Sequence, residues 1–140
     1  MEEIVLRPVK VNARLEGSMV EVKGGLGWGP IHVEEPPEVG GSGKAPSPLD
    51  LAAASLASCE AFMFSMIAGK LGIKFSGVEV EAELDFGLGE GLRRARLIFR
   101  VKGGSREDAE RVVELVRKLC PIYTTIARSG AQVEDEIIVE

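Results

Sequence analysis

Histidine is almost absent from this chain of 140 residues, and its scarcity argues against several kinds of active site. The single histidine is His32, whereas Ser-His-Asp and Cys-His catalysis both need a histidine that an orienting group holds in place. The two cysteines, Cys59 and Cys120, lie far apart in the sequence. They therefore do not form the Cys-x-x-Cys pairs of zinc sites or thioredoxin-type sites. We expect no bound metal ion and no cofactor.

Basic clusters, long apolar runs and leader-like segments are also missing. The net charge of −5, with acidic and basic residues interspersed, argues against nucleic-acid binding through phosphates. The chain has no run of 18 or more apolar residues, so we expect no transmembrane helix. The first residues, Met-Glu-Glu-Ile-Val, lack the features of a signal peptide. We expect a cytoplasmic protein, in which structural disulfides are rare.

The hydrophobic periodicity predicts an α+β fold in a single domain that covers residues 1–140. Alternating segments predict strands, and segments with helical spacing predict helices. The expected order is three strands, a long helix, two strands, a helix and a last strand. The predicted strands cover residues 9–15, 19–23, 31–34, 78–86, 92–101 and 133–139, and the predicted helices cover residues 48–71, 105–119 and 122–128.

The long central helix is the strongest predicted element. Ser47, Pro48 and Asp50 have the types expected at the cap and first turn of a helix. The segment then stays apolar on almost every side until Gly72 ends it. A helix of this kind is buried on most sides, and in a chain this short a second subunit would have to bury part of it. The pattern therefore favours a homodimer.

The two cysteines remain the candidates for chemistry. Cys59 lies in the middle of the apolar helix, where a cysteine is often a small buried core residue. Cys120 precedes Pro121 at the end of a helix, where we expect less apolar shielding. From the residues alone, a structural role for Cys59 and an incidental one for Cys120 remain open.

Two motifs resemble those of the osmotically inducible protein C / organic hydroperoxide resistance (OsmC/Ohr) family. Ala45-Pro46-Ser47-Pro48-Leu49-Asp50-Leu51 precedes a run of small residues, and Cys59 comes eleven residues after Pro48. Cys120-Pro121 followed by Ile122-Tyr123-Thr124 resembles the second cysteine motif of the family. The resemblance extends over essentially the whole chain, and the two motifs are specific when they occur together.

The resemblance implies an OsmC-like fold, with antiparallel sheets around a buried central helix in an intertwined homodimer. It also implies a thiol-dependent peroxidase that reduces organic hydroperoxides. Cys59 would attack the peroxide and become a sulfenic acid, and Cys120 would condense with it to a disulfide. A dithiol partner would then reduce that disulfide. In the family, an arginine from the N-terminal strands favours the reactive thiolate, and Arg14 is the candidate here.

The sequence departs from the peroxidase pattern beside the motif proline. The glutamate that holds the arginine in the family's peroxidases follows that proline directly, and this chain has Leu49 there. Asp50 comes one place later and faces about 180° away from Cys59 on a helix, so a capping role suits it at least as well. The Ser-Pro-Leu-Asp motif is more similar to the family's less characterised branch. The alternative function is therefore a redox-responsive or small-molecule-binding protein without peroxidase turnover.

Overall fold

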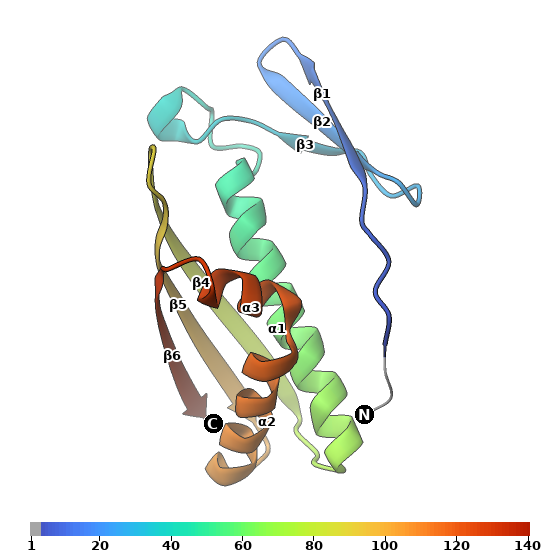
Figure 1. Ribbon diagram of the computed structural model, residues 1–140, viewed down its shortest axis with the longest axis vertical. Helices are drawn as coiled ribbons and strands as arrows, with labels where there is room; N and C mark the ends of the chain where they lie inside the picture. The colour runs from blue at the N-terminus through green and yellow to red at the C-terminus, as the bar shows by residue number, and fades with distance from the viewer. Residues whose placement is uncertain (1–3) are drawn as a thin grey trace. The chain divides into compact units, whose positions relative to one another are not determined.

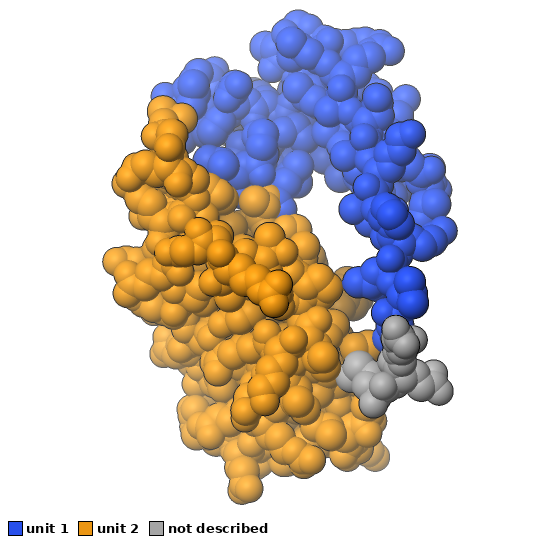
Figure 2. Space-filling model, viewed as in Figure 1, with its two compact units in different colours: residues 1–51 blue, residues 52–140 orange. Residues whose placement is uncertain are grey.

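The computed structural model describes residues 4–140. The chain divides between Leu51 and Ala52 into two compact units, which Figure 2 shows in different colours. The first unit consists mainly of strands and loops. The second unit contains the larger sheet, most of the central helix and both cysteines.

The first unit contains a small antiparallel sheet with the strand order β1-β2-β3. Its strands are β1 (Val11–Glu16), β2 (Met19–Gly24) and β3 (Ile31–Val33). Gly17, with a φ of 64°, makes the tight turn between β1 and β2, as the predicted hairpin requires. The expected loop after β3 contains one short 3-10 turn, η1 (Pro37–Val39).

The central helix α1 (Pro48–Leu71) has the bounds that the sequence predicts. Asp50 accepts hydrogen bonds from the backbone N–H of Ser47 at 2.8 Å and from the Ser47 hydroxyl at 3.0 Å. The Ser47 hydroxyl in turn accepts the backbone N–H of Asp50 at 3.2 Å. This reciprocal pairing satisfies donors that the first turn of a helix leaves unpaired. At the other end, Gly72 adopts a φ of 70° and stops the helix.

The second sheet has the strand order β4-β5-β6 (Figure 1), with strands β4 (Gly77–Gly87), β5 (Gly91–Lys102) and β6 (Gln132–Val139). β4 and β5 pair as the predicted antiparallel hairpin, but β6 runs parallel to β5. Two helices, α2 (Arg106–Leu119) and α3 (Pro121–Ala127), connect β5 to β6. A helical crossover of this kind returns the chain in the same direction, which is why the last pair is parallel.

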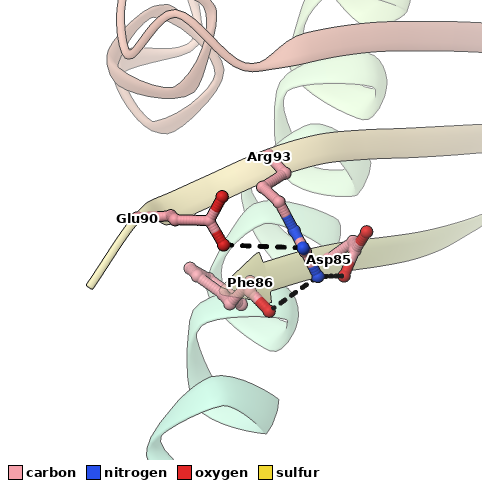
Figure 3. A network of polar contacts seen from close by, with 4 residues as sticks. All are labelled: Asp85, Phe86, Glu90 and Arg93. Atoms are coloured by element: carbon pink, nitrogen blue, oxygen red, sulfur yellow. Dashed lines mark hydrogen bonds and ion pairs between the residues drawn. The ribbon is translucent and has the colours of Figure 1, made fainter. Parts of the chain in front are cut away.

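A bulge strengthens the twist at the turn of the β4–β5 hairpin. The register shifts at Asp85 and Phe86, so that Arg93 is the additional residue on β5. Its guanidinium donates to Asp85 at 3.1 Å and to the Phe86 carbonyl at 3.4 Å, and it lies 3.6 Å from the Glu90 carboxylate (Figure 3). The side chain of Arg93 therefore ties the turn to the end of β4.

The core of the second unit lies between the sheet and its helices. Figure 1 shows α1 and α2 against one face of the β4-β5-β6 sheet. The residues of β4 alternate: its acidic side chains are exposed, and its apolar ones pack toward the helices. The buried cluster takes side chains from α1, β5 and α2, among them Leu56, Phe64, Ile67, Leu97, Phe99, Val112, Val116 and Cys120.

Candidate redox site

The fold brings the two cysteines together. Their Sγ atoms lie 2.8 Å apart although the residues are separated by 61 positions in the sequence. Cys59 lies in the middle of α1, while Cys120 is the residue that joins α2 to α3. Because Pro121 cannot continue α2, the chain turns at Cys120, and the thiol then caps α3 by accepting the backbone N–H of Tyr123 at 3.5 Å.

The two thiols differ in exposure, in the opposite sense to the sequence expectation. Cys120 was expected to be the less shielded residue at a helix end, but it is fully buried in the core. Cys59 is only partly buried. The expectation was wrong because α3 turns directly after Pro121, and the packed helices enclose the thiol at their junction. A reagent that enters from solvent therefore meets Cys59 first.

A buried carboxyl group that neither sequence motif indicated lies next to the thiol pair. Glu60 follows Cys59 on α1, and none of its surface is exposed. Neither of its oxygens has a hydrogen-bond partner among the described residues. Burial raises the pKa of Glu60 to about 7, because a desolvated carboxylate is disfavoured. Glu60 is the only acidic residue between Leu51 and Leu71, and this was the signal available in the sequence.

The surroundings of Glu60 include a second set of polar groups on β6, α2 and α3. The Asp135 carboxylate lies 2.7 Å from Nε of Arg117 and accepts the Tyr123 hydroxyl at 3.2 Å. Burial, with the charge of Asp135, raises the pKa of Tyr123 to about 12, so that the phenol remains a donor at neutral pH. The charge of Asp135 also raises the pKa of Glu60, whereas the charge of Arg117 lowers it.

The Cys120 thiol is close enough to Glu60 for each group to change the pKa of the other, although their contact falls outside strict hydrogen-bond geometry. Burial raises the pKa of Cys120, and the neighbouring Cys59 thiol and Glu60 carboxyl raise it further. Cys120 is therefore a neutral thiol at physiological pH. It becomes a nucleophile only if a base removes its proton.

An apolar cavity of about 290 Å³ opens beside the segments that carry the cysteines. Its lining includes Ser55, one helical turn before Cys59, and Ile122, two residues after Cys120. The remaining lining side chains come mostly from the β4–β5 hairpin and α3, and include Leu84, Phe86, Leu92 and Ile126. Such a surface suits a small apolar group.

The candidate arginine lies in the other unit. Arg14 is an exposed residue on β1 and forms an ion pair with Glu16 of the same strand. The role of Arg14 at the cysteines remains a prediction. Asp50 is engaged in capping α1 through Ser47, as its sequence position suggested. Leu49, at the position of the family's glutamate, is partly exposed and has no carboxylate.

Residues 41–135 match the sequence profile of the family described as OsmC-like protein, which covers more than half of the chain. The chain belongs to the OsmC-like protein family. The resemblance recognised in its motifs is thereby confirmed. No curated protein matches this OsmC-like sequence.

Solved structures share the fold of this OsmC-like chain. An organic hydroperoxide resistance protein from Legionella pneumophila superposes with a TM-score of 0.81 at 24% identity, over 96% of this chain and 99% of that one. An organic hydroperoxide resistance protein from Elizabethkingia anophelis gives a TM-score of 0.83 at 22% identity, over 97% of this chain and 99% of that one. OhrB of Bacillus subtilis gives a TM-score of 0.69 at 23% identity, over 95% of this chain and 99% of that one. At these identities the likeness establishes the α+β OsmC/Ohr fold.

The OsmC-like fold also explains the apolar character of α1. By length and composition alone, this helix could cross a membrane. The sequence had predicted no such helix, because it has no unbroken run of 18 apolar residues. Its side chains Leu56, Phe64 and Ile67 are instead buried in the core, and Glu60 interrupts its apolar sequence. α1 thus contributes one of its faces to the core of the OsmC-like fold. Within residues 4–140, no group of three or more His, Cys, Asp or Glu side chains could hold a metal ion.

Proposed function

We propose that this OsmC-like protein is a thiol-dependent peroxidase that reduces organic hydroperoxides through Cys59 and Cys120. The observation that carries the proposal is the 2.8 Å separation of the two Sγ atoms, one partly exposed and one buried. A disulfide needs the sulfurs at about 2.05 Å, so only a small local movement separates the thiol pair from the oxidised state.

The reaction has two oxidative steps. The Cys59 thiolate attacks the nearer peroxide oxygen, the O–O bond breaks, and the leaving alkoxide takes a proton to become an alcohol. Cys59 is now a sulfenic acid. The Cys120 sulfur attacks the Cys59 sulfur, the S–O bond breaks, and water leaves as the disulfide forms. A dithiol reductant then exchanges with the disulfide, restores both thiols and leaves as its own disulfide.

The cavity of about 290 Å³ and its apolar lining support organic hydroperoxides as the substrate class. An alkyl or aryl group can occupy this cavity while the peroxide group faces the partly exposed Cys59. Hydrogen peroxide has no such group, so it gains nothing from the apolar surface. We therefore expect a preference for organic hydroperoxides.

The remaining parts of the proposal concern the whole protein. Residues 1–140 would act as one OsmC-like domain, and two copies would form a homodimer in the cytoplasm. Arg14 would favour the Cys59 thiolate by its positive charge. The exposed apolar side chain of Phe62 on α1 supports burial by a second copy.

One observation favours a second candidate, a redox-responsive or small-molecule-binding protein without turnover. The position that supplies a glutamate in the family's peroxidases is Leu49, and the carboxylate of the adjacent Asp50 caps α1. Arg14 is itself paired with Glu16. An arginine that no carboxylate holds near Cys59 would leave the thiol slow to react.

The cysteine variants test the peroxidase proposal. Cys59→Ser should abolish consumption of cumene hydroperoxide with a dithiol reductant. Cys120→Ser should consume about one peroxide per chain and leave a sulfenic acid that dimedone traps, because nothing resolves it. The roles are reversed if Cys120→Ser, and not Cys59→Ser, prevents the first oxidation. A wild-type protein that consumes no peroxide with any dithiol would support the second candidate instead.

Arg14 is tested by removing and then restoring its charge. Arg14→Ala should slow the oxidation of Cys59 and shift its rate profile toward higher pH, since the thiolate loses its cation. Arg14→Lys should retain most of the rate. Arg111→Ala, which removes an exposed arginine from α2, is the matched control and should behave as wild type. Equal rates for Arg14→Ala and the control would remove Arg14 from the site.

A further inference from the structure

Among residues 4–140, Glu60 is the one fully buried ionisable group beside the thiol pair that the two-step reaction does not yet use. Both of its oxygens are buried and lack hydrogen-bond partners among the residues that the structure describes. An unpartnered buried carboxyl destabilises a folded protein, because its lost hydration is not replaced. Such a group needs an explanation, and a catalytic role is one of the recognised ones.

The position of Glu60 matches a need of the resolving step. Cys120 is a buried thiol whose pKa is raised by burial, by Cys59 and by Glu60. It therefore cannot attack Cys59 until a base has taken its proton. Glu60 is the carboxyl group in contact with Cys120, and it follows Cys59 directly in α1. Asp135, a partly buried carboxylate nearby, already pairs through one oxygen with Arg117 and Tyr123.

We propose that Glu60 is the proton acceptor for Cys120 in disulfide formation and then the proton donor to the leaving oxygen. This inference rests on the proposed function. The Glu60 carboxylate removes the Cys120 proton, and the Cys120 thiolate attacks the Cys59 sulfur. The S–O bond then breaks, and the departing hydroxide takes the proton from Glu60 and leaves as water. The Glu60 carboxylate is regenerated, and the Cys120 proton leaves in the water molecule.

The groups that face Glu60 suit this cycle. Cys59 and Cys120 lie beside it from α1 and from the α2–α3 junction, while Asp135 acts on it from β6 and Arg117 from α2. Tyr123 of α3 is held by Asp135. Burial places the pKa of Glu60 at about 7, so near neutral pH it is present in both its acidic and its basic form. A group that must accept a proton and return it works best with a pKa close to the operating pH.

The resolving step can be isolated from peroxide chemistry with dithionitrobenzoate, an aromatic disulfide that releases a coloured thiolate. The first release reports attack by Cys59 and leaves a mixed disulfide on it. The second release reports attack by Cys120 on that mixed disulfide. The aromatic thiolate leaves without needing a proton, so the second phase measures only the removal of the Cys120 proton and the attack that follows.

Glu60→Gln is the decisive variant, and Glu114→Gln, an exposed glutamate on α2 paired with Lys118, is its control. We expect Glu60→Gln to slow the second release by roughly 100-fold or more, as the loss of a general base does, and to leave the first within about twofold. If Glu60 acted on Cys120 only through its charge, Glu60→Gln would speed the second release, because the Cys120 thiol would then ionise more easily. An unchanged or faster second release would overturn the proposal.

The wild-type pH profile provides a second measurement that does not depend on the variant's folding. The second release should rise with pH, reach half its maximum near pH 7 and then level off. A rate that continues to rise above about pH 9, as ionisation of the thiol itself would give, contradicts the role of Glu60. If the profile and the variant agree with the proposal but cumene hydroperoxide leaves both thiols intact, the peroxidase function fails and the proton transfer stands.

Discussion

At the scale of single residues, the buried Glu60 makes the stability of the fold depend on pH. In the unfolded chain this carboxyl ionises near its ordinary pKa of 4.5, and in the folded protein it ionises near 7. Between these values the folded state binds the additional proton. The free energy of unfolding therefore falls as the pH rises from about 4.5 to 7, by up to about 3 kcal/mol.

Glu60→Gln should remove this dependence. The variant and the wild type should have similar unfolding free energies near pH 4, where Glu60 is neutral in both states. Above pH 7 the variant should be more stable, by up to about 3 kcal/mol in urea denaturation. Glu114→Gln, which changes an exposed side chain, should stay within about 0.5 kcal/mol of wild type throughout. A difference between wild type and Glu60→Gln that does not change with pH would show that Glu60 is ionised in the folded protein.

The residues of the site were only partly predictable from the sequence. Cys59 and Cys120 were recognised by elimination and by resemblance, and the structure places their sulfurs together. Their exposure was not predictable, because it depends on how α3 turns after Pro121. Glu60 was missed because the burial of one acidic residue in an apolar helix depends on which face of that helix meets the core. Arg14 remains a prediction.

At the scale of secondary-structure elements, the start of α1 depends on the reciprocal pair of Ser47 and Asp50. Ser47→Ala removes the acceptor for the Asp50 backbone N–H and should lower the free energy of unfolding by about 1 kcal/mol. Ser58→Ala is a suitable control, since this exposed hydroxyl donates only to the Ala54 and Ser55 carbonyls of its own helix. If the two variants lose equal stability, the cap contributes nothing particular to α1.

Elements with strong local signals were predicted closely, and their pairing was predicted less well. The bounds of α1 follow from the cap at Ser47 and the stop at Gly72, both of which are local. The β4–β5 hairpin follows from alternation around a glycine-rich turn. The parallel pairing of β6 with β5 is a long-range property, because the sequence of residues 132–139 does not indicate with which strand they pair.

At the scale of the whole molecule, the proposed homodimer has a test in the exposed face of α1. Phe62 is 78% exposed in the single chain, which is unusual for a large apolar side chain in a central helix. The wild type should have the mass of a dimer in light scattering at micromolar concentration, and Phe62→Glu should shift it toward monomer.

Leu88→Glu is the matched control for the dimer. Leu88 is also exposed, but it lies at the turn of the β4–β5 hairpin and not on α1. This variant should stay dimeric. A wild-type protein with the mass of a single chain of 15.0 kDa would contradict the homodimer.

The central claim is that Cys59 and Cys120 form one redox pair that an organic hydroperoxide oxidises. The most direct measurement is a titration of the reduced protein with cumene hydroperoxide, followed by thiol counting and mass spectrometry of peptides. One equivalent of peroxide should remove both thiols and give a Cys59–Cys120 disulfide within each chain, two hydrogens lighter than the reduced form. Two intact thiols after excess peroxide, or a disulfide between chains, would contradict the account.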